Sequence, residues 1–165
     1  MSVSIRRLGV DDVEAFREIR LEAVKSHPDA FAGDYENEVA RDSSRWKDKL
    51  AKTEFYGAEC DGQLIGLIGY SRFEGRKMAH GGKIISMYVR PDFRGRQVGR
   101  DLIAYVVARA RDEIEQLFLC CVTVNHAAYT LYQRMGFVTY GTEPRILKVG
   151  DTYYDEYLMV KDIRL

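Results

Sequence analysis

The segment from Lys83 to Ile114 constrains the fold most strongly, because it changes from the pattern of a strand to that of a helix across a short turn. The run KIISMYV is mostly apolar and ends at Pro91, a residue that cannot extend a central strand. From Val98 onward, apolar residues recur at the 3.6-residue spacing of an amphipathic helix, namely Leu102, Ile103, Val106, Val107, Ala110 and Ile114. The sequence therefore predicts a buried strand, a turn and a helix packed on a sheet.

The rest of the chain mixes the same two patterns. Strands are expected at residues 3–8, 54–60, 63–73, 117–124, 137–142 and 152–160. Helices are expected at residues 9–24, 36–53 and 125–135. The second of these is expected to be short or interrupted, with Ser43 or Ser44 as a possible cap, and Gly136 is expected to end the third. Asp61-Gly62 predicts a hairpin turn. The order of strands and helices along the chain predicts an α+β fold, in which helices cover both sides of a sheet.

Composition excludes several classes of protein. The 165 residues contain neither a repeat nor a linker, so we expect a single domain over residues 1–165. Lys plus Arg (25) balances Asp plus Glu (25), which argues against a nucleic-acid or anionic-membrane partner. The N-terminal MSVSIRRL lacks a signal-peptide core, and no apolar run approaches the roughly 20 residues that span a bilayer. A cytoplasmic protein is the expectation.

The cysteines and histidines do not suggest reactive or metal chemistry. The three cysteines are Cys60, Cys120 and Cys121, an odd number with two adjacent, which indicates free thiols. The strand LFLCCVTV favours buried, small hydrophobic roles for its cysteines over a catalytic thiol. No metal-ligand spacing links them to the histidines, which are His27, His80 and His126, so no metal is expected.

Positive charge gathers where the strand turns into the helix. Arg94, Arg96 and Arg100 surround this turn, and Gly95 and Gly99 allow a ligand to approach the backbone closely. The start of a helix has unpaired N–H groups and a partial positive charge, and guanidinium groups suit phosphate. The Walker and dinucleotide-binding glycine patterns are absent. We expect a phosphorylated small molecule here, although a solvated, capped helix start would explain the same charges.

Two motifs resemble those of the GNAT superfamily of acyl-CoA-dependent N-acetyltransferases. In MYVRPDFRGRQVGR the matching residues are Met87, Val89, Pro91, Arg94 and Gly99. In NHAAYTLYQRMGF they are Asn125, Ala128, Leu131, Tyr132, Gly136 and Phe137. Gln97 departs from the pattern, since the family usually has glycine there and a side chain could crowd a pyrophosphate. The order of strands and helices agrees over almost the whole chain.

The resemblance implies a fold and a cosubstrate. The fold would be a GNAT-like mixed, mostly antiparallel central sheet of about seven strands with helices on both faces. The cosubstrate would be acetyl-CoA, whose pantetheine arm lies between splayed central strands, with Met87 and Val89 offering backbone contacts and an N–H that stabilises the oxyanion. The implied cofactor-binding residues are Met87, Val89, Arg94, Gly95, Arg96, Gln97, Val98, Gly99, Arg100 and Asn125.

The implied reaction moves an acetyl group to a primary amine by direct attack through a tetrahedral intermediate. Tyr132 matches the general acid, because a phenol with a pKa of about 10 can protonate the departing thiolate. A packed tyrosine is the structural alternative. Asn125 would cap the last helix and also contact the pantetheine. The general base stays open, since Ser86 occupies its usual position and is a poor base. Water relayed to backbone carbonyls, or a carboxylate such as Asp155 or Glu156, could substitute, although both carboxylates could equally be ordinary strand residues.

The resemblance also implies an acceptor site that is formed by the segment between the first two helices and by the last hairpin. Phe31, Tyr35 and Tyr154 are the expected substrate-binding residues, with Asp34, Glu36 and Glu38 as acidic groups that could attract a cation. The acceptor would be a small-molecule or peptide amine, and exposed sheet edges allow a homodimer. A non-catalytic acyl-CoA-binding or regulatory domain with the same fold is the alternative, favoured by Ser86 and Gln97.

Overall fold

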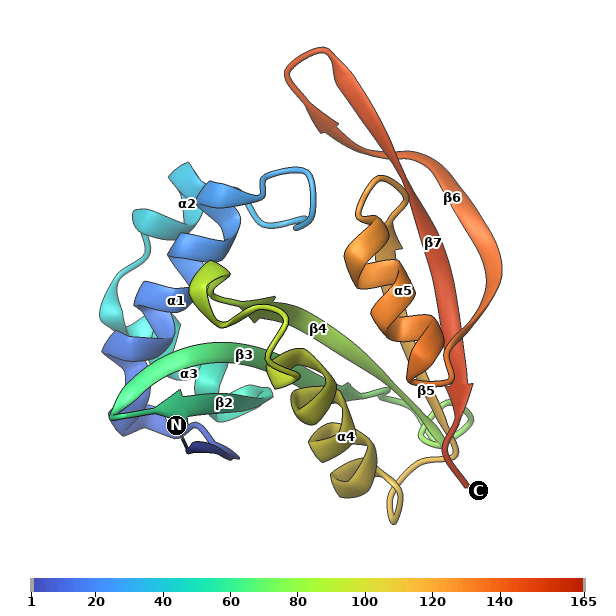
Figure 1. Cartoon of the computed structure of the whole chain (residues 1–165), viewed down its shortest axis with the longest axis horizontal. Coiled ribbons are helices and arrows are strands. Elements are labelled where there is room, and N and C mark those ends of the chain that lie inside the picture. The colour runs from blue at the N-terminus through green and yellow to red at the C-terminus, as the bar shows by residue number, and fades with distance from the viewer. Residues whose placement is uncertain (1, 165) are drawn as a thin grey trace.

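The computed structural model describes residues 2–164. Its strands form one seven-stranded sheet in the order β1-β2-β3-β4-β5-β7-β6, and β4 and β5 form the parallel pair within an otherwise antiparallel arrangement (Figure 1). The strands are β1 (Val3–Arg7), β2 (Glu54–Cys60), β3 (Gln63–Arg72), β4 (Gly81–Val89), β5 (Gln116–Val122), β6 (Val138–Val149) and β7 (Thr152–Asp162). The predicted α+β fold with a mostly antiparallel sheet of seven strands is confirmed.

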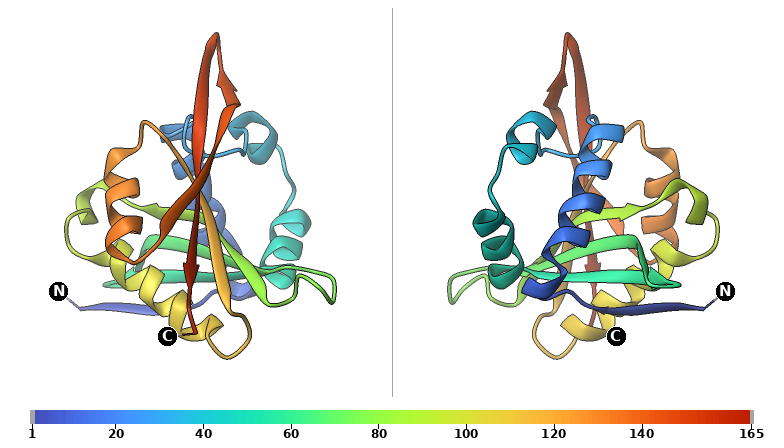
Figure 2. Two further views of the ribbon diagram at one scale, coloured as in Figure 1. Left: turned by 90° about the vertical axis from the view of Figure 1, so that its right-hand side faces the viewer. Right: turned by 90° about the vertical axis from the view of Figure 1, so that its left-hand side faces the viewer.

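Helices cover both faces of the sheet. Those on one face are α1 (Val13–Ser26), α2 (Tyr35–Val39) and α3 (Ser43–Lys52), and those on the other are α4 (Val98–Ala110) and α5 (His126–Arg134) (Figure 2). Short 3-10 turns precede α1 and α4, at Val10–Asp12 and Pro91–Phe93. Within residues 2–164, no helix is both long enough and apolar enough to cross a membrane.

The sheet separates two hydrophobic cores. In β3, Ile65 and Ile68 pack with α4, whereas Leu64 and Leu67 pack with α1 and α3. All four side chains are buried, and each contributes roughly 1.5–3 kcal/mol by leaving water. This double burial explains why the strand reads as a nearly continuous apolar run. A strand buried on both faces holds its register firmly, which fixes β4 beside it.

Local sequence signals predicted one turn and one helix interruption correctly and one helix cap wrongly. Asp61 and Gly62 both have positive φ (49° and 78°), so the predicted β2–β3 hairpin turn is confirmed. The predicted cap at Ser43 or Ser44 is wrong, because the carboxylate of Asp42 accepts the hydrogen bond from the N–H of Arg45. The interruption before α3 is confirmed, since Val39 ends α2.

The helix that begins at Val98 is shorter than its apolar pattern predicts. It ends at Ala110, and Ile114 is buried in the turn that follows. The N–H groups of Glu113 and Ile114 both bond to the carbonyl of Ala110, and the N–H of Glu115 bonds to that of His80. The chain therefore leaves the helix to start β5, and Ile114 joins the core from a turn.

The two central strands separate along their length. The register of β4 and β5 pairs Gly81 with Gln116, and the last pair joins Lys83 to Phe118. Farther along, β4 also bulges, because its pairing with β3 shifts and leaves Ser86 and Met87 opposite a single residue. The splayed strands that the family resemblance implies are therefore present.

A buried ion pair fixes the helices beside this opening. Arg20 of α1 donates from Nε and Nη2 to the carboxylate of Glu38 in α2, at 2.9 and 2.8 Å. Their side chains are 7% and 2% exposed. Burial opposes ionisation of Glu38, but the hydrogen bonds and charge of Arg20 outweigh it, so the pKa of the Glu38 carboxyl lies below its usual value. The α1–α2 connection is thereby held against the sheet.

Gly33→Ala should destabilise the protein by about 1–3 kcal/mol, because an added Cβ would lie 2.2 Å from Glu38 Oε1 and 2.4 Å from Arg20 Nη2. Neither atom can move without disturbing the buried pair. Gly9→Ala is the matched control, since no atom lies within 4 Å of its added Cβ. Denaturant unfolding measures both variants. Equal unfolding midpoints for the two would contradict this account of the loop.

Candidate functional site

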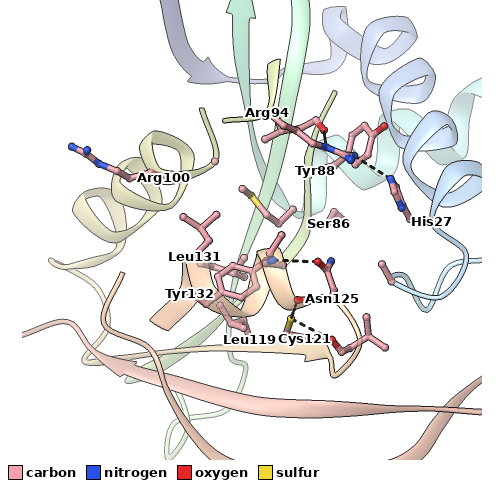
Figure 3. Close-up of a pocket in the computed structure, with 18 of the residues that line it drawn as sticks. His27, Ser86, Tyr88, Arg94, Arg100, Leu119, Cys121, Asn125, Leu131 and Tyr132 are labelled. Carbon is pink, nitrogen blue, oxygen red and sulfur yellow. Dashed lines mark hydrogen bonds between the residues drawn. The ribbon is translucent and has the colours of Figure 1, made fainter. Parts of the chain in front are cut away.

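A cavity of about 1050 Å³ lies where β4 and β5 separate (Figure 3). Its walls come from both faces of the sheet, since Ile85 and Tyr88 belong to the core beside α1, whereas Leu119 and Tyr132 belong to the core beside α4 and α5. The connection after α1 closes one end through His27, Asp29, Ala30 and Phe31. The turn before α4 lines the other end. The opening in the sheet therefore joins the surfaces on its two faces.

The turn into α4 presents unpaired backbone donors to this cavity. Gly95 and Gln97 have positive φ (73° and 66°), and within the described chain no side chain caps the first turn of the helix. Most of the residues expected to bind the cofactor line the cavity, namely Met87, Val89, Arg94, Gly95, Gln97, Val98, Gly99, Arg100 and Asn125. Arg96 does not line it and lies over the ring of Phe93. This end of the cavity suits an anionic group.

Gln97 shows why glycine is favoured at its position. A left-handed backbone costs an ordinary residue roughly 1–2 kcal/mol, whereas glycine adopts it freely. The side-chain oxygen of Gln97 accepts a hydrogen bond from Nη1 of Arg100 at 2.6 Å. It is therefore directed to the arginine and does not cap the N–H groups of the helix.

Arg94 joins the two ends of the cavity. Its Nε donates to the carbonyl of Val89 at 2.9 Å, and its Nη2 lies 3.0 Å from Nε2 of His27 (Figure 3). Because a guanidinium has only donors, the histidine nitrogen accepts this bond. The guanidinium also lies 5.6 Å from the ring centre of Tyr88. Sequence patterns do not predict His27 at this position, because a lone histidine after a helix has no spacing pattern.

Tyr132 lies on the face of α5 that points into the cavity (Figure 3). It is buried, and burial, followed by the nearby Cys121, raises the pKa of its hydroxyl above the usual value. The phenol therefore stays protonated at neutral pH. Asn125 caps the same helix, since its Oδ1 accepts from the N–H of Ala128 at 3.2 Å. The predicted cap is thus confirmed.

The cysteines near the cavity are not activated. Cys121 is buried, and burial raises the pKa of its thiol to about 12. The pKa of Cys120 is also raised by burial. Neither is a thiolate at neutral pH, which agrees with the interpretation of both as strand residues. Among residues 2–164, no group of three or more His, Cys, Asp or Glu side chains could hold a metal ion.

The expected acceptor residues are only partly brought together. Phe31 lines the cavity and packs edge-on against Tyr88. Tyr35 lies under the ammonium of Lys25, and Tyr154 pairs with Leu147 in the last hairpin, so neither lines the cavity.

Three acidic residues of the α1–α2 region and of the last hairpin, Glu38, Asp34 and Asp155, have structural roles. Glu38 is paired with Arg20, which makes the expectation that it attracts a cation wrong. Asp34 caps α2 through the N–H of Glu36. Asp155 accepts from the N–H of Arg145 at a bulge of β6, as an ordinary strand residue would.

Comparison with known proteins identifies the family. The profile described as "Acetyltransferase (GNAT) family" matches residues 15–137. The chain belongs to the GNAT family. The fold is also that of solved structures, since a GNAT-family acetyltransferase from Streptococcus pneumoniae superposes with a TM-score of 0.86 at 21% identity, over 98% of this chain and 99% of that one. The structure of yncA from Salmonella typhimurium, solved with its cofactor acetyl-CoA, gives 0.80 at 20% identity, over 99% and 95%.

Curated GNAT relatives differ in the acceptor for which they are named. A mycothiol acetyltransferase from Cellulomonas flavigena is 31% identical over 146 residues, and the match covers 81% of this chain but 41% of the relative. A spermidine N(1)-acetyltransferase from Thermoplasma acidophilum is 25% identical over 98% of both chains. An L-methionine sulfoximine/L-methionine sulfone acetyltransferase from Pseudomonas aeruginosa is 27% identical over 88% and 86%.

Gln97→Gly should raise the free energy of unfolding by about 0.5–1 kcal/mol, because it removes the left-handed strain in the turn before α4. The same replacement at Gln133, an exposed residue inside α5, should lower it by about 1 kcal/mol. Thermal or denaturant unfolding measures both. Loss of stability in both variants would show that the turn is not strained.

Proposed function

We propose that the protein is an acyl-CoA-dependent N-acetyltransferase that moves an acetyl group from acetyl-CoA to a primary amine by direct attack through a tetrahedral intermediate. The observation that carries the proposal is the cavity through the sheet, which joins the uncapped start of α4 to Tyr132 and to the connection after α1. We further propose that residues 1–165 act as one GNAT-type domain. A homodimer and a cytoplasmic location stay predictions.

The phosphate end of the cofactor fits the turn before α4. The N–H groups of Val98 and Gly99 lie at the positive end of a 13-residue helix, with Arg100 beside them. An added Cβ at Gly99 would lie 3.1 Å from atoms of both Met87 and Leu131, so glycine permits the close packing of this turn. The diphosphate of coenzyme A would accept hydrogen bonds from these amides.

The thioester end fits the gap between β4 and β5. The bulge at Ser86 and Met87 interrupts the pairing of β4 with β3, and beyond Lys83 no pairing with β5 is present in the described chain. Backbone groups of Met87 and Val89 are therefore proposed to hold the pantetheine arm, and an N–H there is proposed to stabilise the oxyanion. The carbonyl of Val89 already accepts from Arg94, which leaves the N–H of Val89 for this role.

Tyr132 is proposed as the general acid. Its hydroxyl stays protonated, and burial strengthens a hydrogen bond to sulfur as negative charge develops there. Within residues 2–164 no hydrogen bond to another residue occupies the hydroxyl. The base is less well defined, because Ser86 accepts a hydrogen bond from Arg20 and is a poor proton acceptor. We propose that ordered water relays the amine proton.

A non-catalytic acyl-CoA-binding domain is the alternative, and Ser86 at the usual position of the base is the observation that favours it. Thiol release from acetyl-CoA over a panel of amines separates the two functions. Release with at least one acceptor supports the transferase. Binding of the cofactor without release for any amine supports the regulatory domain.

Tyr132→Phe should lower kcat about 10²-fold with little change in affinity for acetyl-CoA, because it removes the proton donor and keeps the ring. Tyr129→Phe is the matched control on the same helix, where the hydroxyl lies against Thr139. Steady-state kinetics and calorimetry with coenzyme A measure the two effects. Unchanged kcat in Tyr132→Phe would remove this residue as the acid.

Arg100→Gln should weaken coenzyme A binding about three- to tenfold and leave pantetheine binding unchanged, because it removes one exposed charge near the phosphates. Arg111→Gln, at the opposite end of α4, is the control. Titration calorimetry at low and high salt measures both ligands. A loss of affinity that is equal for coenzyme A and pantetheine would place the phosphates elsewhere.

A further inference from the structure

The hydroxyl of Ser86 has a defined direction. Its Oγ accepts a hydrogen bond from Nη1 of Arg20 at 3.1 Å. A guanidinium cannot accept a hydrogen bond, so the hydroxyl proton of Ser86 must point elsewhere. Within residues 2–164 no acceptor receives it, and Ser86 lines the cavity (Figure 3). The bulge of β4 therefore presents a hydrogen-bond donor to the cavity.

Arg20 cannot easily turn away from Ser86. Two of its nitrogens are bound to the buried carboxylate of Glu38, and its guanidinium carbon lies 5.3 Å from the ring centre of Phe31. Breaking a buried ion pair is costly, so the third nitrogen keeps its direction. The backbone of Ser86 has a φ of 54°, which also limits where its side chain can go. The Ser86 hydroxyl is therefore held in place by Arg20 and by its own backbone.

The charges around this end of the cavity favour an oxygen ligand over a cation. Asp29 is the one carboxylate among the described residues that line the cavity. The guanidinium of Arg94 also reaches this end, where it bonds to His27. The nearby carboxylate of Glu38 is used by Arg20, and that of Asp34 caps α2. A ligand with several positive charges would find one carboxylate here, whereas an anionic oxygen would find the Ser86 donor and the guanidinium of Arg94.

We propose that Ser86, positioned by Arg20, donates a hydrogen bond to a carboxylate of the acyl acceptor, so that the preferred acceptor is a small amine that also carries a carboxylate, such as an α-amino acid. The inference rests on the proposed acetyltransferase function and narrows its acceptor class. Ser86 would then serve substrate binding in place of the base that it cannot supply. Arg20 is a positioning residue, because it acts through Ser86.

The test is a set of matched acceptors with saturating acetyl-CoA. Each α-amino acid is assayed beside the amine that remains when its carboxylate is removed, and spermidine represents polyamines. We expect at least one amino acid to have a kcat/KM about tenfold or more above its decarboxylated partner and above spermidine. Ser86→Ala should raise KM for that amino acid about tenfold, with kcat nearly unchanged and the decarboxylated amine affected less than twofold.

Three variants separate binding from structure. Ser86→Asn keeps a donor in a residue that tolerates the left-handed backbone, and should restore KM to within about threefold. Ser71→Ala, on an exposed part of β3, is the control and should leave all constants unchanged. Replacing both members of the buried pair (Arg20→Met with Glu38→Leu) avoids an unpaired charge and should abolish the preference for the amino acid.

The outcomes distinguish this inference from the proposed function. Turnover of decarboxylated amines or spermidine at an equal or higher kcat/KM overturns the inference and leaves the transferase intact. An equal effect of Ser86→Ala on both classes of acceptor overturns it as well. Failure to release thiol with every amine, while coenzyme A still binds, overturns the proposed function and the inference with it.

Discussion

The parallel pairing of β4 with β5 ends after three residue pairs, and the rest of the site depends on this limit. Had the ladder continued to Val89, the two strands would have closed the sheet and left no cavity between them. Because pairing stops at Lys83, backbone groups of both strands face a space that reaches both cores. Each face of the sheet can then contribute its own surface to one site.

The strain in this region is concentrated at two positions beside the cavity. Ser86 and Gln97 are both non-glycine residues with positive φ, one at the β4 bulge and the other at the start of α4. A hydrogen bond from a neighbouring arginine holds each side chain in place. Arg20 donates to Ser86, and Arg100 donates to Gln97. Such strain persists where the surrounding structure enforces it, which is a common property of binding sites.

Local patterns in the sequence predicted much of the fold. The hairpin at Asp61-Gly62 and the cap at Asn125 depend on chemistry within a few residues, and both were confirmed. The cap of α3 was misassigned because Asp42, Ser43 and Ser44 are all good capping residues and only the backbone geometry decides among them. Family motifs identified the turn before α4 and Tyr132 as candidates, whose roles stay predictions.

Long-range contacts were beyond the reach of sequence patterns. The Arg20–Glu38 pair joins two helices across an irregular loop. The hydrogen bond from Arg20 to Ser86 joins residues that are 66 positions apart in the chain. His27 likewise meets Arg94 across 67 positions. Neither contact has a periodic signal, because each depends on how α1 packs on the sheet. The acceptor end of the site is made mainly of such contacts, so it was the part least accessible from sequence.

A passage that is lined from both faces of a sheet affects the order in which ligands can enter and leave. In the proposed reaction, two reactants would be bound together in this passage, so neither would have to depart before the other enters. The proposed transfer would then need no storage of the acetyl group on a side chain of the protein, and the buried, protonated thiol of Cys121 would line the passage without taking part.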